Sequence, residues 1–431
     1  MKMTRLATAI ALAFITQGAM AADASIEQKL EILQKELDEL RSEMAKLKSQ
    51  QPTPQPAARG EEGAASGPPS VMPSSMGGLA AGSNTFGAYG ELHYNNYRDG
   101  DKKDEIDFHR FVLFYGHKFN DRLRFYSELE VEHALVEGGA ESGAVELEQA
   151  FIDYRINDAF NLKAGAMLVP IGILNETHEP PTFFGVERNE VESRIIPTTW
   201  REAGIGVHGE IVQGLRYEAG ILSGMDAGKF ERPDRAVRSM RTELSEAAAH
   251  DFAFYGALNY RGIPGLAVGA SVYTGDTGQN GASDAALKNV NGRLLLWDVH
   301  AQYRLGGLEL RGLYASGTLG DADKITAAAI ARSGDTAQVA PSRFWGYYGE
   351  AGYHFRLGDE MELSPFVRYE RYNTQASVPS GFSADRKNNE RVTTLGVNFK
   401  LHPQVVFKAD YQDFKEDPKK DRFSLGVGYM F

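Results

Sequence analysis

Apolar and polar residues alternate strictly over the last nine residues of the chain. Phe423, Leu425, Val427, Tyr429 and Phe431 occupy every second position, so an extended strand places all five on one face. Small residues and one methionine form the other face. A final strand that is apolar on one side is typical of the closing strand of a transmembrane β-barrel, whose apolar side contacts lipid. A terminal strand of a soluble sheet would show the same pattern, so the remaining chain must decide.

The alternation extends from about residue 86 to the C-terminus. In the predicted strand over 123–132, apolar residues share one face, and three glutamates follow one another on the other face. Successive carboxylates need water, which the lumen of a barrel supplies and the dry core of a β-sandwich does not. The same parity predicts inward-facing charges on other strands. The predicted pore-lining residues are Arg124, Arg155, Arg368, Glu128 and Glu130.

Short and long connections alternate along this region. The short ones are rich in Asn, Asp and Gly, which favour tight hairpin turns. They fall at 120–121, 157–158, 213–214, 261–265, 306–307, 358–359 and 401–404. Longer polar connections fall near 98–104, 134–144, 169–200, 223–250, 274–292, 316–343, 373–389 and 415–421. This arrangement predicts an all-β fold, a 16-stranded antiparallel transmembrane β-barrel whose termini face the periplasm.

The N-terminus predicts export. Lys2 and Arg5 precede an apolar run over about 6–15, and Ala19-Met20-Ala21 follows. A basic start, a short hydrophobic core and an A-x-A site form a secretory signal peptide, which we assign to residues 1–21. The apolar run is too short for a transmembrane helix, so we expect strands to hold the protein in the outer membrane.

Residues 22–48 carry a heptad seam of apolar residues. Its members are Ile26, Leu30, Leu33, Leu37, Leu40, Met44 and Leu47. We predict a short coiled-coil helix in the periplasm, in reach of peptidoglycan, and an amphipathic helix lying on another surface is the alternative. Pro, Gly, Ala and Ser dominate residues 49–85, which we assign to a linker. The barrel then occupies residues 86–431.

Composition excludes some partners. The chain has no cysteine and a formal net charge of −12. An exported protein without disulfides depends on its own hydrogen-bonded architecture. The acidic total argues against nucleic acid as a partner. It does not decide ion selectivity, because only charges that line the lumen act on a permeating ion.

Two stretches resemble the phosphate-selective porin O and P family of Gram-negative outer membranes. They are Phe86-Gly-Ala-Tyr-Gly-Glu-Leu-His and the run over 165–209, which reads GAMLVPIGILNETHEPPTFFGVERNEVESRIIPTTWREAGIGVHG. The resemblance covers the whole barrel. It implies a homotrimer in a bilayer that contains lipopolysaccharide, with the third long loop folded inward to narrow each pore. It also implies permeation of small solutes, including inorganic anions such as phosphate, or organic acids.

The third long loop, at 169–200, supplies the candidate constriction. Arg188, Arg194 and Arg201 are the predicted constriction residues, because guanidiniums form local anion sites. The same loop and its end carry more acidic than basic side chains. These acids are Glu176, Glu179, Glu187, Glu190, Glu192 and Glu202. Opposed acids and bases would create a transverse field that orients polar solutes.

The sequence therefore predicts a porin for passive diffusion of small hydrophilic solutes, with a preference for anions. The alternative is a structural or adhesive envelope protein whose barrel anchors the coiled coil. We predict no enzymatic activity, cofactor or metal site, because His178-Glu179 precedes two prolines and no G-x-S-x-G elbow occurs. The histidines His93, His109, His117 and His133 are interpreted as single lumenal or rim residues on different strands. Trp200, Trp297 and Trp345 are predicted to lie in interfacial girdles or in the trimer contact.

Overall fold

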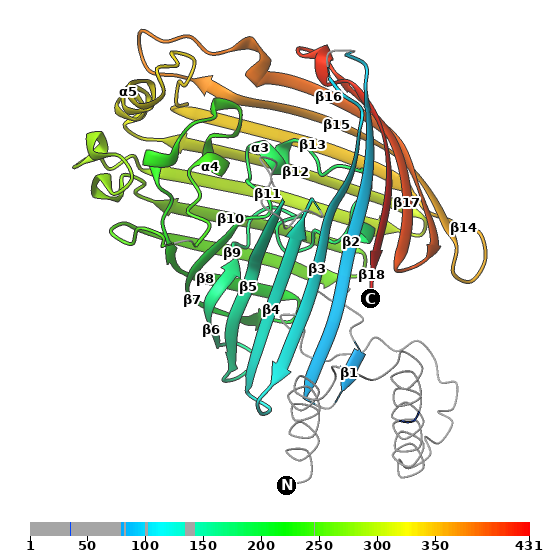
Figure 1. The fold of residues 1–431 in the computed structure, drawn as a ribbon. Coiled ribbons are helices and arrows are strands. Elements are labelled where there is room, and N and C mark those ends of the chain that lie inside the picture. Colours follow the sequence, from blue (N-terminus) through cyan, green and yellow to red (C-terminus); the bar gives the residue numbers. More distant parts are fainter. Residues whose placement is uncertain (1–34, 36–78, 82, 100–101, 134–142, 245) are drawn as a thin grey trace, which may run out of the picture. The chain divides into compact units, whose positions relative to one another are not determined.

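Sixteen long antiparallel strands form a closed barrel in the computed structural model, which describes Lys35 and residues 79–81, 83–99, 102–133, 143–244 and 246–431. Each strand pairs with the next in the chain, and the last pairs with the first (Figure 1). The strands are β2 (Asn84–Tyr97), β3 (Glu105–Lys118), β4 (Leu123–Glu132), β5 (Ala144–Arg155), β6 (Asn161–Leu168), β7 (Arg201–Val212), β8 (Leu215–Ser223), β9 (Phe252–Ile263), β10 (Leu266–Gly275), β11 (Leu294–Leu305), β12 (Leu308–Leu319), β13 (Arg343–Tyr353), β15 (Glu362–Ser377), β16 (Asn389–His402), β17 (Val405–Phe414) and β18 (Arg422–Met430). Because the barrel is closed, the sheet has no unpaired edge. Strands inside a membrane need this pairing, since hydrocarbon offers no hydrogen-bond partner to a free edge.

Two short strands extend this sheet. β1 (Leu79–Ala81) pairs with β2, and β14 (Phe355–Arg356) pairs with β15 in the hairpin that follows β13. The predicted signal peptide, the coiled coil apart from Lys35 and most of the linker fall outside the described residues. Within the described part of the chain, no helix has the length and hydropathy needed to cross a bilayer.

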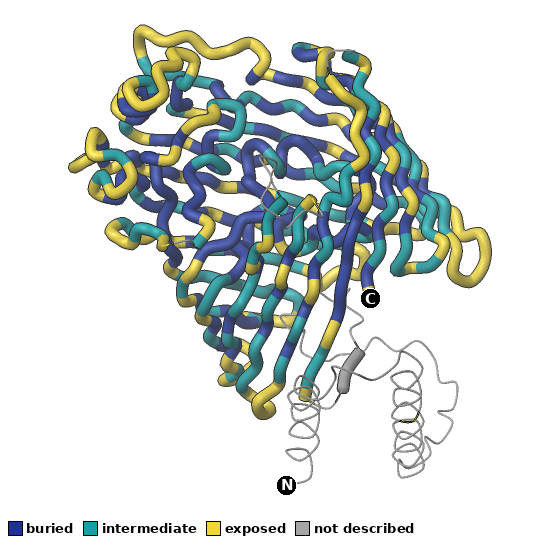
Figure 2. Tube along the Cα trace, viewed as in Figure 1, coloured by how far each residue is buried: buried dark blue, intermediate teal, exposed yellow. Residues whose placement is uncertain are grey.

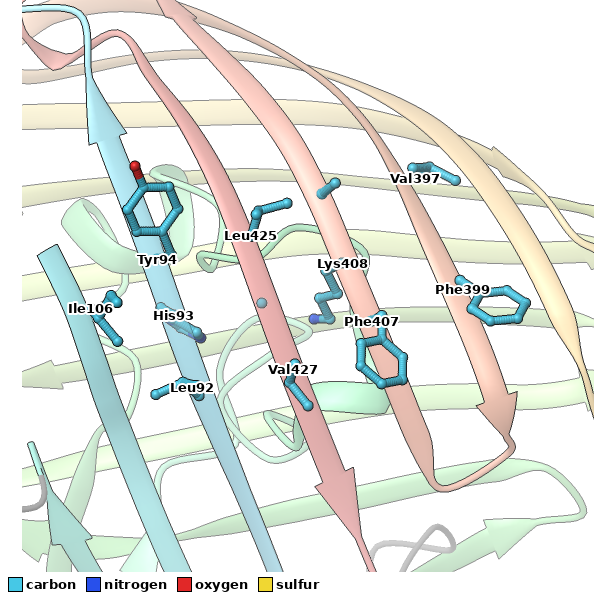
Figure 3. A pocket seen from close by; sticks show the side chains of 12 residues that line it. Leu92, His93, Tyr94, Ile106, Val397, Phe399, Phe407, Lys408, Leu425 and Val427 are labelled. Atoms are coloured by element: carbon cyan, nitrogen blue, oxygen red, sulfur yellow. The ribbon is translucent and has the colours of Figure 1, made fainter. Parts of the chain in front are cut away.

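The two faces of each strand have opposite chemistry, as predicted. On β18, Phe423 and Leu425 are 40% and 42% exposed on the outside, whereas Ser424 on the inside is fully buried. Large apolar side chains cover the outer surface of the neighbouring strands as well, among them Val397, Phe399 and Phe407 (Figure 3). Such a continuous exposed apolar belt needs hydrocarbon as its solvent.

Loop length is sorted by end, also as predicted. Short turns join β3 to β4, β5 to β6, β7 to β8 and the later hairpins, while the other end carries the long connections. Along the strands buried residues alternate with more accessible ones, and runs of exposed residues lie in the short turns and in several long connections (Figure 2). The long connections hold short helices, namely η1 (Pro180–Thr182), α3 (Val191–Arg194), η2 (Ala227–Lys229), η3 (Pro233–Arg235), α4 (Ala236–Ser239), η4 (Gln279–Gly281), η5 (Ala285–Leu287), α5 (Ala322–Ser333), η6 (Arg386–Asn388) and η7 (Pro418–Lys420).

The prediction for Trp200 was wrong. Its side chain is fully buried inside the barrel, where the indole packs on Tyr273 at 4.5 Å between ring centroids and Nε1 donates to Glu202 at 3.0 Å. Trp200 is the last residue of the long connection that enters the lumen. Its ring therefore packs inside the barrel and not in a lipid-facing girdle. Trp297, on the outer face of β11, is 38% exposed as expected for a girdle residue.

Candidate pore constriction

The connection between β6 and β7, residues 169–200, lies against the inner wall of the barrel; we call it the constriction loop. Its short helix α3 packs against the inner side of β13 and β15 (Figure 1). Ile195, Ile196 and Trp200 of this loop are fully buried. The loop therefore occupies lumenal space that sixteen strands alone would leave open to water.

Charged side chains of the wall hold the main chain of the constriction loop. From β3, β12 and β17, three basic side chains donate hydrogen bonds to its carbonyl groups. These bonds run from Arg110 to His178 at 2.5 Å, from Arg311 to Thr182 at 2.8 Å and from Lys408 to Gly185 at 2.8 Å. The carboxylate of Asp410 accepts from the amide of Val186 at 2.6 Å. Charge-assisted bonds of this kind satisfy backbone groups that have no sheet partner and fix the path of the loop.

Glycines on the wall allow the loop to approach closely. A Cβ atom at Gly352 of β13 would lie 2.4 Å from the ring of Phe184, and one at Gly428 of β18 would lie 2.3 Å from Pro180. Phe184 also stacks on Phe366 of β15 with ring centroids 5.2 Å apart. Small wall residues thus receive the apolar side chains of the loop.

Each of the three predicted constriction arginines is already engaged. Arg188 donates to the hydroxyl of Thr199 at 2.9 Å. Arg194 pairs with Glu190 and, at 2.8 Å, with Asp234, while Arg201 pairs with Glu146 at 2.6 Å. The structure therefore places them along the loop and at its end, each with a separate partner.

A second row of arginines meets this loop, and the sequence analysis missed it. Arg232, Arg235, Arg238 and Arg241 recur at every third position of the connection between β8 and β9. Arg238 donates to the carbonyl of Thr198 at 2.9 Å, and Arg241 donates to that of Thr199. The three-residue spacing over η3 and α4 was the available signal, because it places several guanidiniums on one side of a short helix.

These arginines repel one another. Burial, together with the charges of Arg241, Arg235 and Arg188, lowers the pKa of Arg238. Burial and the charge of Arg194 likewise lower the pKa of Arg235. A lowered pKa means that the local environment disfavours the positive charge, so an entering anion would relieve the repulsion.

A basic cavity of about 550 Å³ opens beside this row at the long-loop end of the barrel. Its charged lining residues are Lys229, Arg232, Arg235, Arg238, Arg241, Arg332, Glu231 and Glu243. Within this lining, bases outnumber acids. The buried Nε atoms of Arg235 and Arg241 have no hydrogen-bond acceptor among the described residues. The guanidiniums that line the cavity are suited to donate hydrogen bonds to an anionic solute.

A smaller cavity of about 190 Å³ lies toward the short-turn end, below Phe183 and Phe184 of the constriction loop. Its charged lining comprises Arg304, Arg311, Lys400, His354 and Glu309. Basic side chains again predominate, although Arg304 and Arg311 both pair with Glu309. Cavities with a surplus of basic side chains thus lie on both sides of the constriction loop, one toward each end of the barrel.

The predicted pore-lining residues have different positions. Glu128, Glu130 and Arg368 are buried on the inner side, at 3%, 3% and 2% exposure. Arg368 pairs with Glu370 at 2.8 Å and Glu350 at 3.1 Å. Arg124 and Arg155 lie near the short turns, where Arg155 pairs with Asp158 at 2.6 Å. These two arginines therefore lie at the short-turn rim of the barrel.

Comparison with known proteins agrees with this architecture. A protein of Aquifex aeolicus that carries no functional description is 38% identical over 354 residues, which is 80% of each chain. Our chain belongs to the same family as this protein. In addition, residues 245–431 match the family model described as an outer membrane protein beta-barrel domain, which supports an outer-membrane location.

Solved structures share the fold at low sequence identity. OmpF of Salmonella typhi, solved in complex with daunomycin, is 14% identical with a TM-score of 0.56, covering 81% of this chain and 98% of that one. The outer membrane channel DcaP of Acinetobacter baumannii is 10% identical with a TM-score of 0.50, covering 82% and 99%. These structures show that the chain shares its barrel fold with OmpF and DcaP.

Proposed function

We propose that this protein is an outer-membrane porin through which small hydrophilic anions diffuse passively, with the constriction loop as the narrowest part of the pore. The arginine row at 232–241 carries the proposal, because its guanidiniums line an accessible cavity at the mouth. The basic cavity at the opposite end supports the same direction of selectivity. Inorganic phosphate and small organic acids are the solute classes that such guanidiniums bind.

Acidic side chains in the lumen do not oppose this proposal. Glu309, Glu350 and Glu370 each contact arginines of the wall, so their charges are largely compensated. An ion in transit responds to net charge along its path, and six basic side chains stand against two acidic ones in the lining of the mouth cavity.

Reversal potentials across a planar bilayer with a KCl gradient test the proposal. The wild-type channel should prefer chloride to potassium. Replacing Arg235, Arg238 and Arg241 together with Gln should shift the reversal potential toward zero, because three positive charges leave the mouth. Arg293→Gln is the matched control, since this arginine is 66% exposed at the same end and paired with Asp276. A cation preference in the wild type would overturn the assignment of anions.

The proposal extends to assembly. We infer a homotrimer, as the resemblance to the phosphate-selective porin family implies, with the N-terminal coiled coil placed in the periplasm near peptidoglycan. Cross-linking of the detergent-solubilised protein, followed by mass determination, should give three chains per particle.

A further inference from the structure

Three histidines that the sequence places apart come together at the long-loop end of the barrel. His109 lies on β3 and His133 directly follows β4, with Asp107 of β3 between their rings. His93 of β2 stacks on His109 with centroids 4.8 Å apart. The interpretation of His93, His109 and His133 as single residues was therefore wrong, although they come from different parts of the sheet.

A β-bulge aims these side chains. Glu91 pairs with Arg110 and His93 pairs with Asp107, so one residue of β2 faces two residues of β3 between these pairs. The extra residue shifts which positions of β3 face inward. Asp107, His109 and Arg110 can therefore all direct their side chains to the inner side of the barrel. Bulges are used in this way to redirect side chains next to functional sites.

The donor atoms have the spacing of ligands on one ion. Asp107 Oδ2 lies 3.2 Å from His109 Nδ1 and 2.8 Å from His133 Nδ1, and the three atoms lie within 4.8 Å of one another. Two ligands that bind one metal at about 2.1 Å are separated by about 3.0–3.4 Å in octahedral or tetrahedral geometry. The group thus needs little movement to bind a cation.

Access favours this group over a second one deeper in the barrel. Asp107, His109 and His133 have side chains that are 25%, 30% and 42% exposed, so an ion can enter and keep water ligands. Glu128, Glu148 and His178 also cluster, but all three are buried. In addition, the hydroxyl of Tyr89 is hydrogen-bonded to His178 Nε2 at 2.9 Å, so this nitrogen is already engaged.

We propose that Asp107, His109 and His133 bind a divalent first-row transition metal ion, with Zn²⁺ as the best fit to two imidazoles and one carboxylate. Imidazole nitrogens favour such ions over Mg²⁺ and Ca²⁺, which prefer all-oxygen sites. The site contacts the pore machinery through His93, whose Nδ1 lies 3.1 Å from Glu187 of the constriction loop. A bound ion therefore fixes the ring of His109, on which His93 stacks, and His93 in turn contacts the constriction loop.

Isothermal titration of the untagged, full-length protein in detergent with ZnCl₂, after removal of metals by chelation, tests the proposal. We expect one Zn²⁺ per chain, undiminished by excess Mg²⁺. His109→Ala and His133→Ala should each weaken binding by about 100-fold or more, since even changes beyond the ligands cost about 10–100-fold. Binding is measured without conduction, so its outcome is independent of the proposed anion channel.

His250→Ala is the matched control, because His250 also contacts a single aspartate, Asp251, at 3.0 Å on an exposed loop. It should bind Zn²⁺ as the wild type does. His133 is the most exposed of the three ligands, so its replacement keeps the test decisive if His109→Ala does not fold. Co²⁺ absorption in the visible range provides a second readout, which His133→Ala should abolish. Absence of binding in the wild type, or equal binding in His133→Ala, would overturn the site.

Discussion

Lys408 of β17 donates a hydrogen bond from Nζ to the carbonyl oxygen of Gly185 at 2.8 Å, which joins the barrel wall to the constriction loop inside it. The same ammonium lies 3.6 Å from the centroid of the Phe183 ring. Lys408 is 5% exposed, so water does not replace either contact. One wall cation thus holds both the main chain and a side chain of the constriction loop.

Replacing Lys408 with Met should loosen this part of the loop. Methionine keeps the apolar length of the side chain but removes a charge-assisted hydrogen bond worth about 1.5–3 kcal/mol. We expect more frequent conductance fluctuations in single-channel recordings. Lys324→Met is the control, because Lys324 is 53% exposed on α5 and pairs with Asp321 of its own loop. Identical traces for wild type and Lys408→Met would refute the tethering role.

Gly352 should not tolerate a side chain. A Cβ at this position meets the Phe184 ring at 2.4 Å, so Gly352→Ala must displace the ring or the strand. Overpacking of this kind costs about 1–3 kcal/mol. The thermal unfolding temperature in detergent should fall. Gly349→Ala on the same strand is the control, since its Cβ would meet no atom within 4 Å. Equal stability of the two variants would show that the loop can move away freely.

The barrel could be predicted because every strand repeats one local rule. Alternation of apolar and charged residues fixes which face meets lipid, and turn residues fix where each strand ends. These signals are contained within a few neighbouring residues, as the nine residues of β18 show. Loop lengths then assign the two ends of the barrel.

The site was harder to predict because its contacts join distant residues. The inward parity of Glu128 and Arg368 follows from their own strands, but the pairing of Arg194 with Asp234 depends on how two long loops meet. The cluster around Asp107 was missed because a bulge shifts the parity of β3 at that point. Periodicity alone cannot locate a bulge, so His109 was assigned without its neighbours.

The outer face of β18 should reject charge. Leu425 is 42% exposed and points away from the barrel wall among other apolar side chains (Figure 3). An arginine in the hydrocarbon region of a barrel costs about 2–4 kcal/mol at mid-depth. Leu425→Arg should therefore fold less stably in lipid vesicles, as measured by denaturant titration, while Leu425→Phe should fold like the wild type. An unchanged midpoint for the arginine variant would place this face outside the bilayer.

The pair of Glu190 and Arg194 should make the constriction loop resistant to acid. Burial raises the pKa of Glu190, but the nearby charges of Arg194, Arg422 and Arg235 outweigh it and hold the pKa at about 2, below the ordinary value of 4.5. Because the folded pKa is the lower one, this stabilisation is fully present above about pH 4.5 and is lost as the pH falls toward 2.

The change in single-channel conductance that follows from protonation of Glu190 should accordingly appear only below about pH 4.5 in the wild type. In Arg194→Gln, burial raises the pKa of Glu190 and the charge of Arg194 no longer opposes it. The conductance change should therefore occur at higher pH than in the wild type. Arg232→Gln is a suitable control, because this arginine is 56% exposed and also contacts Asp234 but not Glu190. A transition at the same pH in Arg194→Gln and the wild type would show that the ion pair does not set the acid limit of the loop.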